Sequence, residues 1–153
     1  MLLVGGIPHQ APPAPSVSSS DQGWQTWGMA LSVTRVVPVL RIFDVQRAKE
    51  FYLDYLGFQL DWEHRFEPEM PLYCQISRAG AILHLSEHHG DGSPGVVVYV
   101  EVSGVRDYHS ELHGKGYSYL RPGLEVDEIG TCLEAIDPFG NRIRFNEPPA
   151  KQP

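Results

Sequence analysis

PVLRIFDVQRAKEFYLDYLGF, residues 38–58, contains the pattern that decides the fold. Alternating apolar residues open it and favour a strand, and Asp44 then supplies a side chain of the type that caps helix N-termini. After the cap, apolar residues recur at i, i+3, i+4, i+7 and i+8, which is the period of an amphipathic helix, and Gly57 ends that helix. The segment predicts a strand that leads into a helix over residues 45–56. The buried stripe of this helix is expected to comprise Ala48, Phe51, Tyr52, Tyr55 and Leu56.

The same order of elements returns about 60 residues later in the chain. VVPVLRIFD (36–44) aligns with VVVYVEVSG (96–104), and GAILHLSE (80–87) aligns with GNRIRFNE (140–147). Few residues are identical between the two copies, so the shared order of elements carries the comparison. Two stretches of similar length, each a strand, a helix and further strands, indicate duplication of one structural unit.

A second helix is expected over residues 104–114, with Ser103 as its N-cap. The duplication predicts an α+β fold of two βαβββ modules, at about 36–88 and 95–147, whose curved mixed sheets surround a cleft. Both modules are expected to belong to a single domain, residues 35–148.

Residues 1–34 differ in composition from the two modules. APPAPSVSSSDQG (11–23) is rich in proline and serine and has no apolar periodicity, so we expect a disordered N-terminal extension. Two interpretations stay open. The folded protein begins near Met29 and the rest is an upstream extension, or the segment is a genuine arm, because Trp24 and Trp27 are costly to leave exposed.

The composition fits one acidic globular domain. The chain has 153 residues, of which 42% are hydrophobic and 20% charged, and its formal net charge is −7. This charge disfavours nucleic acid and anionic membranes as partners and favours cationic ones, although a simple solubility role explains it equally well. No stretch approaches the roughly 20 apolar residues of a transmembrane helix. The two cysteines, Cys74 and Cys132, do not make a disulfide framework, so we expect a cytoplasmic protein.

Strand alternation divides each expected sheet into an apolar and a polar face. The apolar side chains should pack against the helices. They are Leu40, Ile42, Leu83, Leu85, Val98, Val100, Val102, Ile143 and Phe145. The opposite face carries His84, Tyr99, Glu101 and Arg144. Such a mixture of aromatic and charged residues is typical of a cleft lining and not of a core.

Residues 38–58 and LEAIDPFGNRIRFNE (133–147) resemble the vicinal-oxygen-chelate superfamily, which includes glyoxalase I, extradiol dioxygenases, fosfomycin-resistance enzymes and bleomycin-resistance proteins. Residues 38–58 are similar to that family's strand, capped helix with an FY pair, and LGF exit. Residues 133–147 are similar to its DPxGxxIxF closing hairpin. The resemblance covers about residues 36–148 and implies the same fold, but this fold hosts several chemistries.

The resemblance also implies where a metal would bind. In metal-using members, one ligand comes from the first strand and one from the last strand of each module. The matching positions here are Val37, His84, Val97 and Arg144. Valine has no donor atom, and the arginine guanidinium has no lone pair to offer. We therefore expect no metal, no cofactor and no catalytic residue in this cleft.

The missing metal ligands agree with the bleomycin-resistance branch of the superfamily. For that branch, the resemblance implies a protein that binds its antibiotic without a metal at this position. Our main hypothesis is a homodimeric, metal-free binding protein that sequesters a cationic antibiotic or similar small molecule in a cleft at the dimer interface. Pro38 indicates an edge or hinge position in the first strand, because proline cannot donate to a ladder. The alternative is a glyoxalase-type lyase or dioxygenase-related enzyme with atypical metal ligands. A third hypothesis is a ligand-sensing or immunity module.

Two carboxylates are candidates for contact with a ligand. Glu101 and Glu134 are both expected on the cleft side, where they could bind a cation or act as acid and base. The competing expectation is a buried salt network in which they pair with Arg144, Arg41 or His84.

Two aromatic residues, Trp62 and Phe66, lie in the expected strand DWEHRF, and alternation leaves open which of them faces the cleft. One is expected in the core and the other in an aromatic wall for a planar ligand, with Tyr99 opposite. The full set of expected ligand-binding residues is Trp62, His84, Tyr99, Glu101, Glu134 and Arg144.

Overall fold

The computed structural model describes residues 31–150. The extension expected over residues 1–34 therefore lies almost entirely outside the described residues. Residues 31–38 contain neither helix nor strand, and Thr34 begins the compact unit that holds every element of the described chain. Within residues 31–150, no helix is long and apolar enough to cross a membrane.

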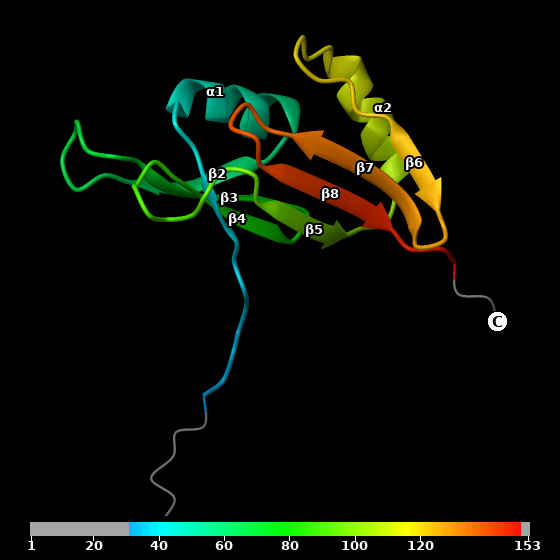
Figure 1. Ribbon diagram of the computed structural model, residues 1–153, viewed down its shortest axis with the longest axis horizontal. Helices are drawn as coiled ribbons and strands as arrows, with labels where there is room; N and C mark the ends of the chain where they lie inside the picture. The colour runs from blue at the N-terminus through cyan, green and yellow to red at the C-terminus, as the bar shows by residue number, and fades with distance from the viewer. Residues whose placement is uncertain (1–30, 151–153) are drawn as a thin grey trace, which may run out of the picture. The chain divides into compact units, whose positions relative to one another are not determined.

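Each module consists of a strand, a helical segment and three further strands (Figure 1). The first module contains β1 (Val39–Arg41), α1 (Val45–Lys49), the π-helical segment η1 (Glu50–Tyr55), β2 (Gln59–His64), β3 (Tyr73–Arg78) and β4 (Ala81–Ser86). The second module contains β5 (Val97–Glu101), α2 (Val105–Lys115), β6 (Leu124–Asp127), β7 (Gly130–Ile136) and β8 (Arg142–Glu147). This is the α+β arrangement of two βαβββ modules that the sequence predicts.

The two modules build two four-stranded mixed sheets of the same topology. Their strand orders are β1-β4-β3-β2 and β5-β8-β7-β6. In each sheet the first strand runs parallel to the last, and all other neighbours are antiparallel. The first strand of each module is thus an edge strand, which agrees with Pro38 immediately before β1. The carbonyl of Pro38 accepts a hydrogen bond from the backbone of His84 at 3.0 Å.

The apolar stripe of the first helix is buried as predicted, but the helix is not α-helical throughout. It changes to a π-helix at Glu50, where the backbone N–H of Leu56 donates to the carbonyl of Phe51, five residues earlier, at 2.8 Å. The wider turn still points the stripe inward, because Phe51, Tyr52 and Leu56 are fully buried. An i, i+3, i+4 pattern does not distinguish an α-turn from a single π-turn.

The expected helix caps are correct for one module and wrong for the other. The side chain of Asp44 accepts from the backbone N–H of Arg47 at 2.9 Å, as predicted. Ser103 does not cap α2, because Gly104 holds the N-cap position with a φ of 79°. The capping group is the carboxylate of Glu147, which accepts from the N–H groups of Gly104 at 2.9 Å and Val105 at 3.2 Å. Glu147 reaches the helix only because β8 pairs with β5, which is a tertiary contact.

The inward faces of both sheets pack on the helices as the alternation predicts. Leu40, Ile42, Leu83 and Leu133 are at most 2% exposed, and they belong to one apolar core that includes residues of both modules. On β5, the valines of the inward face are only half-buried, so the second sheet is less well covered near its edge strand.

A polar cluster ties the turn between β7 and β8 to the first module. The buried carboxylate of Asp137 accepts from the hydroxyl of Tyr52 at 2.7 Å and from the backbone and side chain of Asn141. The Asn141 side chain also donates to the carbonyl of Arg41 at 2.8 Å. We call these four residues, Arg41, Tyr52, Asp137 and Asn141, the closed junction. The DPFGN sequence of the turn is therefore a structural clamp between modules.

Candidate functional site

An aromatic face lies on the side of the first sheet opposite its buried residues. It consists of Trp62, Tyr73 and His84, from β2, β3 and β4. The Trp62 ring stacks nearly parallel to that of Tyr73 with centroids 6.0 Å apart, and the imidazole of His84 meets both rings edge-on at 5.3 Å. Trp62 keeps 42% of its surface exposed. The face therefore presents ring surface that a flat apolar group could cover.

The expectation that either Trp62 or Phe66 packs in the core is wrong. β2 is one of the two edge strands of its sheet, and none of its residues is buried. Phe66 lies beyond the end of β2 and is 74% exposed. The register of β2 also shifts between Leu60 and Trp62. Alternation in sequence does not report which strand is outermost, so it could not predict that both rings stay outside the core.

A chain of hydrogen bonds across the aromatic face engages both ring nitrogens of His84. The hydroxyl of Ser77 and the side-chain amide of Gln75 both donate to Asp61, each at 2.8 Å. Because a carboxylate only accepts, the oxygen of Gln75 is left to accept from Nε2 of His84 at 3.1 Å. Nδ1 of His84 lies 2.9 Å from the hydroxyl of Tyr73, which donates to it when the imidazole is neutral. The lowered pKa of His84 favours this neutral form.

The pKa values of His84, Asp61 and Tyr73 are shifted in directions that favour a neutral imidazole, an ionised carboxylate and a neutral phenol. Burial, and secondly the charge of Arg35, lower the pKa of His84. Hydrogen bonds from its two donors lower the pKa of Asp61. Burial raises the pKa of Tyr73. At neutral pH the first sheet therefore combines a neutral imidazole, a neutral phenol and an ionised carboxylate.

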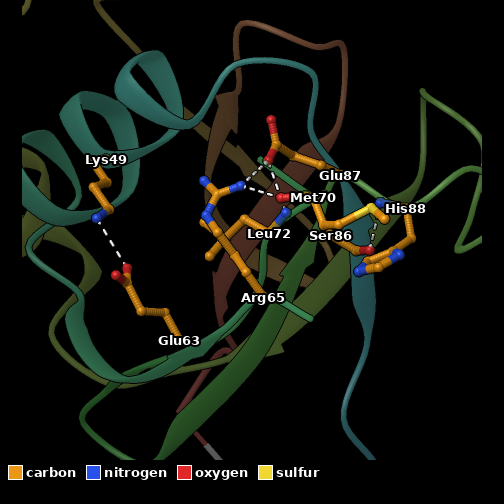
Figure 2. Close-up of polar contacts among 8 residues, drawn as sticks. All are labelled: Lys49, Glu63, Arg65, Met70, Leu72, Ser86, Glu87 and His88. Atoms are coloured by element: carbon orange, nitrogen blue, oxygen red, sulfur yellow. Dashed lines mark hydrogen bonds and ion pairs between the residues drawn. The ribbon is translucent and has the colours of Figure 1, made fainter. Parts of the chain in front are cut away.

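Glu87 holds the loop between β2 and β3, the two strands that carry Trp62 and Tyr73 (Figure 2). Its carboxylate accepts from the backbone N–H of Leu72 at 2.8 Å and from Arg65 at 3.4 Å. Figure 2 shows that Arg65 also donates to the main chain of this loop, at the carbonyl of Met70. The loop ends are thus fixed against β4, which limits the freedom of the aromatic face.

The open face of the second sheet carries an ion-pair cluster and no aromatic stack. Glu134 on β7 accepts from Arg144 at 2.7 Å and from Arg142 at 3.1 Å, both on β8. The expected salt network thus forms at Glu134, but it is not buried, because both arginine side chains are 46% exposed. Hydrogen bonding to Glu134 raises the pKa of Arg144. Tyr99 on β5 lies across from Arg144 and is 53% exposed.

Glu101 lies apart from this cluster, at the end of β5. It lines a groove of about 910 Å³ between the second module and the turn from β3 to β4. None of the ion pairs within residues 31–150 includes it. The six expected ligand-binding residues therefore occupy three places in this chain. They are the first sheet (Trp62, His84), the second sheet (Tyr99, Glu134, Arg144) and the groove (Glu101).

Comparison with known families agrees with this architecture. A family model described as glyoxalase superfamily protein matches residues 20–151, which is most of the chain. The chain belongs to the glyoxalase superfamily. No curated protein matches it.

Solved structures of similar fold include several proteins that bind antibiotics. The bleomycin-binding protein of bleomycin-producing Streptomyces verticillus, solved with copper(II)-bleomycin, is 24% identical, covers 78% of this chain and 100% of its own, and has a TM-score of 0.60. TnmS3, an antibiotic binding protein from Streptomyces sp. CB03234, is 23% identical, with coverages of 80% and 100% and a TM-score of 0.59. The bleomycin resistance determinant encoded on the transposon Tn5 is 16% identical, with coverages of 76% and 98% and a TM-score of 0.59. At these identities the likeness establishes the fold.

The metal-ligand positions implied by the superfamily do not fit a metal in this chain. Val37 and Val97 have no donor atoms. Arg144 is a cation already held by Glu134. His84 is the one remaining candidate, and its ring nitrogens are both used in hydrogen bonds. No group of three or more His, Cys, Asp or Glu side chains within residues 31–150 is placed to hold a metal ion.

Sequence reasoning missed Gln75 and Asp61, which set the state of His84. Gln75 is 8% exposed and lies directly opposite His84 in the antiparallel register of β3 and β4. A signal was available, since Tyr73, Gln75 and Ser77 alternate with apolar residues and so share one face of β3. Asp61 carried no such signal, because its partners become neighbours only when β2 pairs with β3.

Proposed function

We propose that this glyoxalase-superfamily protein is a metal-free binding protein that sequesters a small organic molecule against the open faces of its sheets. The observation that carries the proposal is the state of His84. It alone among the four metal-equivalent positions could ligate, yet Tyr73 and Gln75 occupy both of its ring nitrogens. A divalent ion would have to break one of these hydrogen bonds and would still find one ligand only. His84 is instead part of the aromatic face, where its ring meets Trp62 and Tyr73 edge-on.

The chemistry of the first sheet supports a cationic, partly aromatic ligand. The stacked rings of Trp62 and Tyr73 offer a surface to which cations and flat groups are attracted. His84 is neutral and does not repel a cation, and Asp61 is ionised nearby. On the second sheet Glu134 is already neutralised by two arginines, so we assign to Arg144 a contact with acceptor atoms of the ligand. The similar structures include bleomycin-binding proteins, which makes bleomycin the first ligand to test.

The exposed faces also support a two-fold homodimer with the cleft between its subunits. Trp62, Val97 and Tyr99 are large side chains with exposures of 42%, 48% and 53% on the two open faces. In addition, β1 and β5 are unpaired on their outer edges within the described chain, and such edges attract a partner. A dimer that sets the first sheet of one protomer against the second sheet of its partner brings Trp62 and Arg144 to one cleft. Sedimentation at micromolar concentration should give twice 17.1 kDa.

Titration calorimetry with metal-free bleomycin tests the function. Wild-type protein should bind in the presence of EDTA, and Trp62→Ala should weaken binding at least tenfold, because a partly exposed aromatic that the ligand covers is a typical hot spot. Tyr119→Ala removes an aromatic side chain that is 87% exposed and lies on neither open face, so it should bind like the wild type.

Two results would count against the proposal. Binding that requires added zinc, nickel, iron or manganese, and that is lost in His84→Ala, would restore a metal-dependent enzyme as the better account. Equal binding by the wild type and Trp62→Ala would remove the aromatic face from the site.

A further inference from the structure

The turns that close the two modules differ in size at equivalent positions. Residues 77–81, Ser-Arg-Ala-Gly-Ala, align with residues 137–141, Asp-Pro-Phe-Gly-Asn, at the offset of 60. In the second module, Asp137 and Asn141 reach into the first module and form the closed junction, and the ring of Phe139 meets that of Phe43 at 6.0 Å. The equivalent residues of the first module are too small to do the same.

The space left by the smaller turn is the groove that contains Glu101. Its volume is about 910 Å³, at the upper end of what small-molecule sites occupy. Ala79, Gly80 and Ala81 form one wall, and a Cβ atom added at Gly80 would meet nothing within 4 Å. The floor is apolar, with Phe58 and Phe145 among its residues. The groove is therefore open because its turn has no large side chain to fill it.

Carboxylates dominate the polar lining of the groove. Among the described residues that line it, Arg78 is the only lysine or arginine. Its guanidinium pairs with Glu111 at 2.6 Å and donates to the carbonyl of Leu56 at 2.8 Å. It also stacks over the ring of Tyr108 at 4.6 Å. Glu101 and Asp107 also line the groove, and no ion pair among residues 31–150 involves either of them. The electrostatic balance favours a cation.

The start of α2, which also lines the groove, does not reverse this preference. A helix N-terminus ordinarily attracts anions through its free N–H groups. Here the carboxylate of Glu147 already accepts from Gly104 and Val105. An incoming anion would have to compete with Glu147 and would face Glu101 and Asp107 as well.

We propose that this groove is a second ligand site, separate from the aromatic face, that takes an organic cation with an apolar body. The ammonium or amidinium group lies between Glu101 and Asp107, and the apolar part covers Phe58 and Phe145. Arg78 is a positioning residue, since it neutralises Glu111, which also lines the groove, and anchors the wall of the groove to the carbonyl of Leu56. The site does not depend on the function proposed for the aromatic face.

Phenethylammonium is a suitable probe. Phenethyl alcohol and phenylacetate are its neutral and anionic control compounds, with a similar aromatic body. Titration of the full chain, followed by calorimetry and by amide NMR shifts, should give binding of the cation at least tenfold tighter than that of either control compound. The shifts should gather at residues 78–81 and 101–107. Glu101→Gln/Asp107→Asn should weaken binding at least tenfold, and Ala81→Leu should block the groove. Glu128→Gln, an exposed carboxylate outside the groove, should change nothing.

Several outcomes would overturn the proposal. Equal binding of the three probes would mean that the carboxylates play no part. Undiminished binding in Ala81→Leu, with an unchanged thermal unfolding curve, would place the probe elsewhere. Loss of binding in Trp62→Ala, but not in Glu101→Gln/Asp107→Asn, would assign the probe to the aromatic face. Conversely, failure of bleomycin to bind that face leaves the phenethylammonium result unaffected.

Discussion

The turn from β7 to β8 ties the two modules together, whereas the equivalent turn from β3 to β4 leaves its side of the molecule open. The β7–β8 turn places a buried carboxylate and a fully buried amide against the other module. The β3–β4 turn, with two alanines and a glycine, leaves a groove of about 910 Å³. The two copies of the module thus differ, since one turn holds the modules together and the other leaves the groove that we propose as a ligand site.

The open faces of the two sheets also differ, in the charge of the side chains at equivalent positions. His84 and Arg144 occupy equivalent positions on the last strand of each module. The first is a neutral imidazole within an aromatic stack, and the second is a permanent cation paired with Glu134. A ligand that spans both faces meets ring surface on one side and hydrogen-bond donors on the other.

The largest expected effect comes from breaking the closed junction. Asp137→Ala leaves the hydroxyl of Tyr52 and the backbone N–H of Asn141 buried without an acceptor, and the side-chain amide of Asn141 keeps only the carbonyl of Arg41. Since each buried unsatisfied group costs about 1–3 kcal/mol, the free energy of unfolding should fall by about 3 kcal/mol or more. Urea denaturation measures this free energy of unfolding.

The matched variant of the other turn is Ser77→Ala, which removes one donor to an exposed Asp61 and should cost about 1 kcal/mol or less. Equal losses at the two turns would contradict the contrast between them.

A smaller effect is expected from the caps of the two helices. Glu147→Ala leaves the N–H groups of Gly104 and Val105 without their acceptor, and the loss of such a cap costs about 1–2 kcal/mol. Asp44→Ala removes the corresponding cap of α1 and should cost about 1 kcal/mol. Urea unfolding of both variants tests whether a carboxylate from a distant strand replaces the local cap. An unchanged stability of Glu147→Ala, beside a destabilised Asp44→Ala, would show that α2 needs no cap.

Local pattern was sufficient to predict the module order, the first helix with its stripe, and the inward faces of the strands. These features depend on residues within one turn or one strand of each other, such as Ala48 and Tyr52. The N-cap at Asp44 was predicted correctly for the same reason, since its side chain accepts from a backbone N–H only three residues along the chain.

The rest depends on contacts between distant elements. The cap from Glu147, the exposure of Trp62 and the role of Gln75 all follow from which strands are neighbours and which is outermost. Alternation could assign five of the six candidate residues to the outward faces of strands, but it left the side of Trp62 open. The division of the six residues among two sheet faces and a groove could not be predicted, because the groove arises from the small size of residues 79–81, which carry no chemistry of their own.

The smallest expected effect is a pH dependence that distinguishes His84 from Arg144. Burial lowers the pKa of His84 below the ordinary value of 6.5. Between the folded pKa and 6.5, the unfolded chain binds more protons than the folded chain, so stability falls as the pH falls and levels off below the folded pKa. His84→Gln removes this contribution, and the difference in unfolding free energy between wild type and His84→Gln should shrink from pH 7.5 to pH 5.0.

Arg144→Gln serves as the matched variant of the other module. A guanidinium does not titrate in this range, so the difference between wild type and Arg144→Gln should stay constant across it. Parallel curves for wild type and His84→Gln would mean that His84 has the same pKa folded and unfolded, and would contradict the lowered pKa.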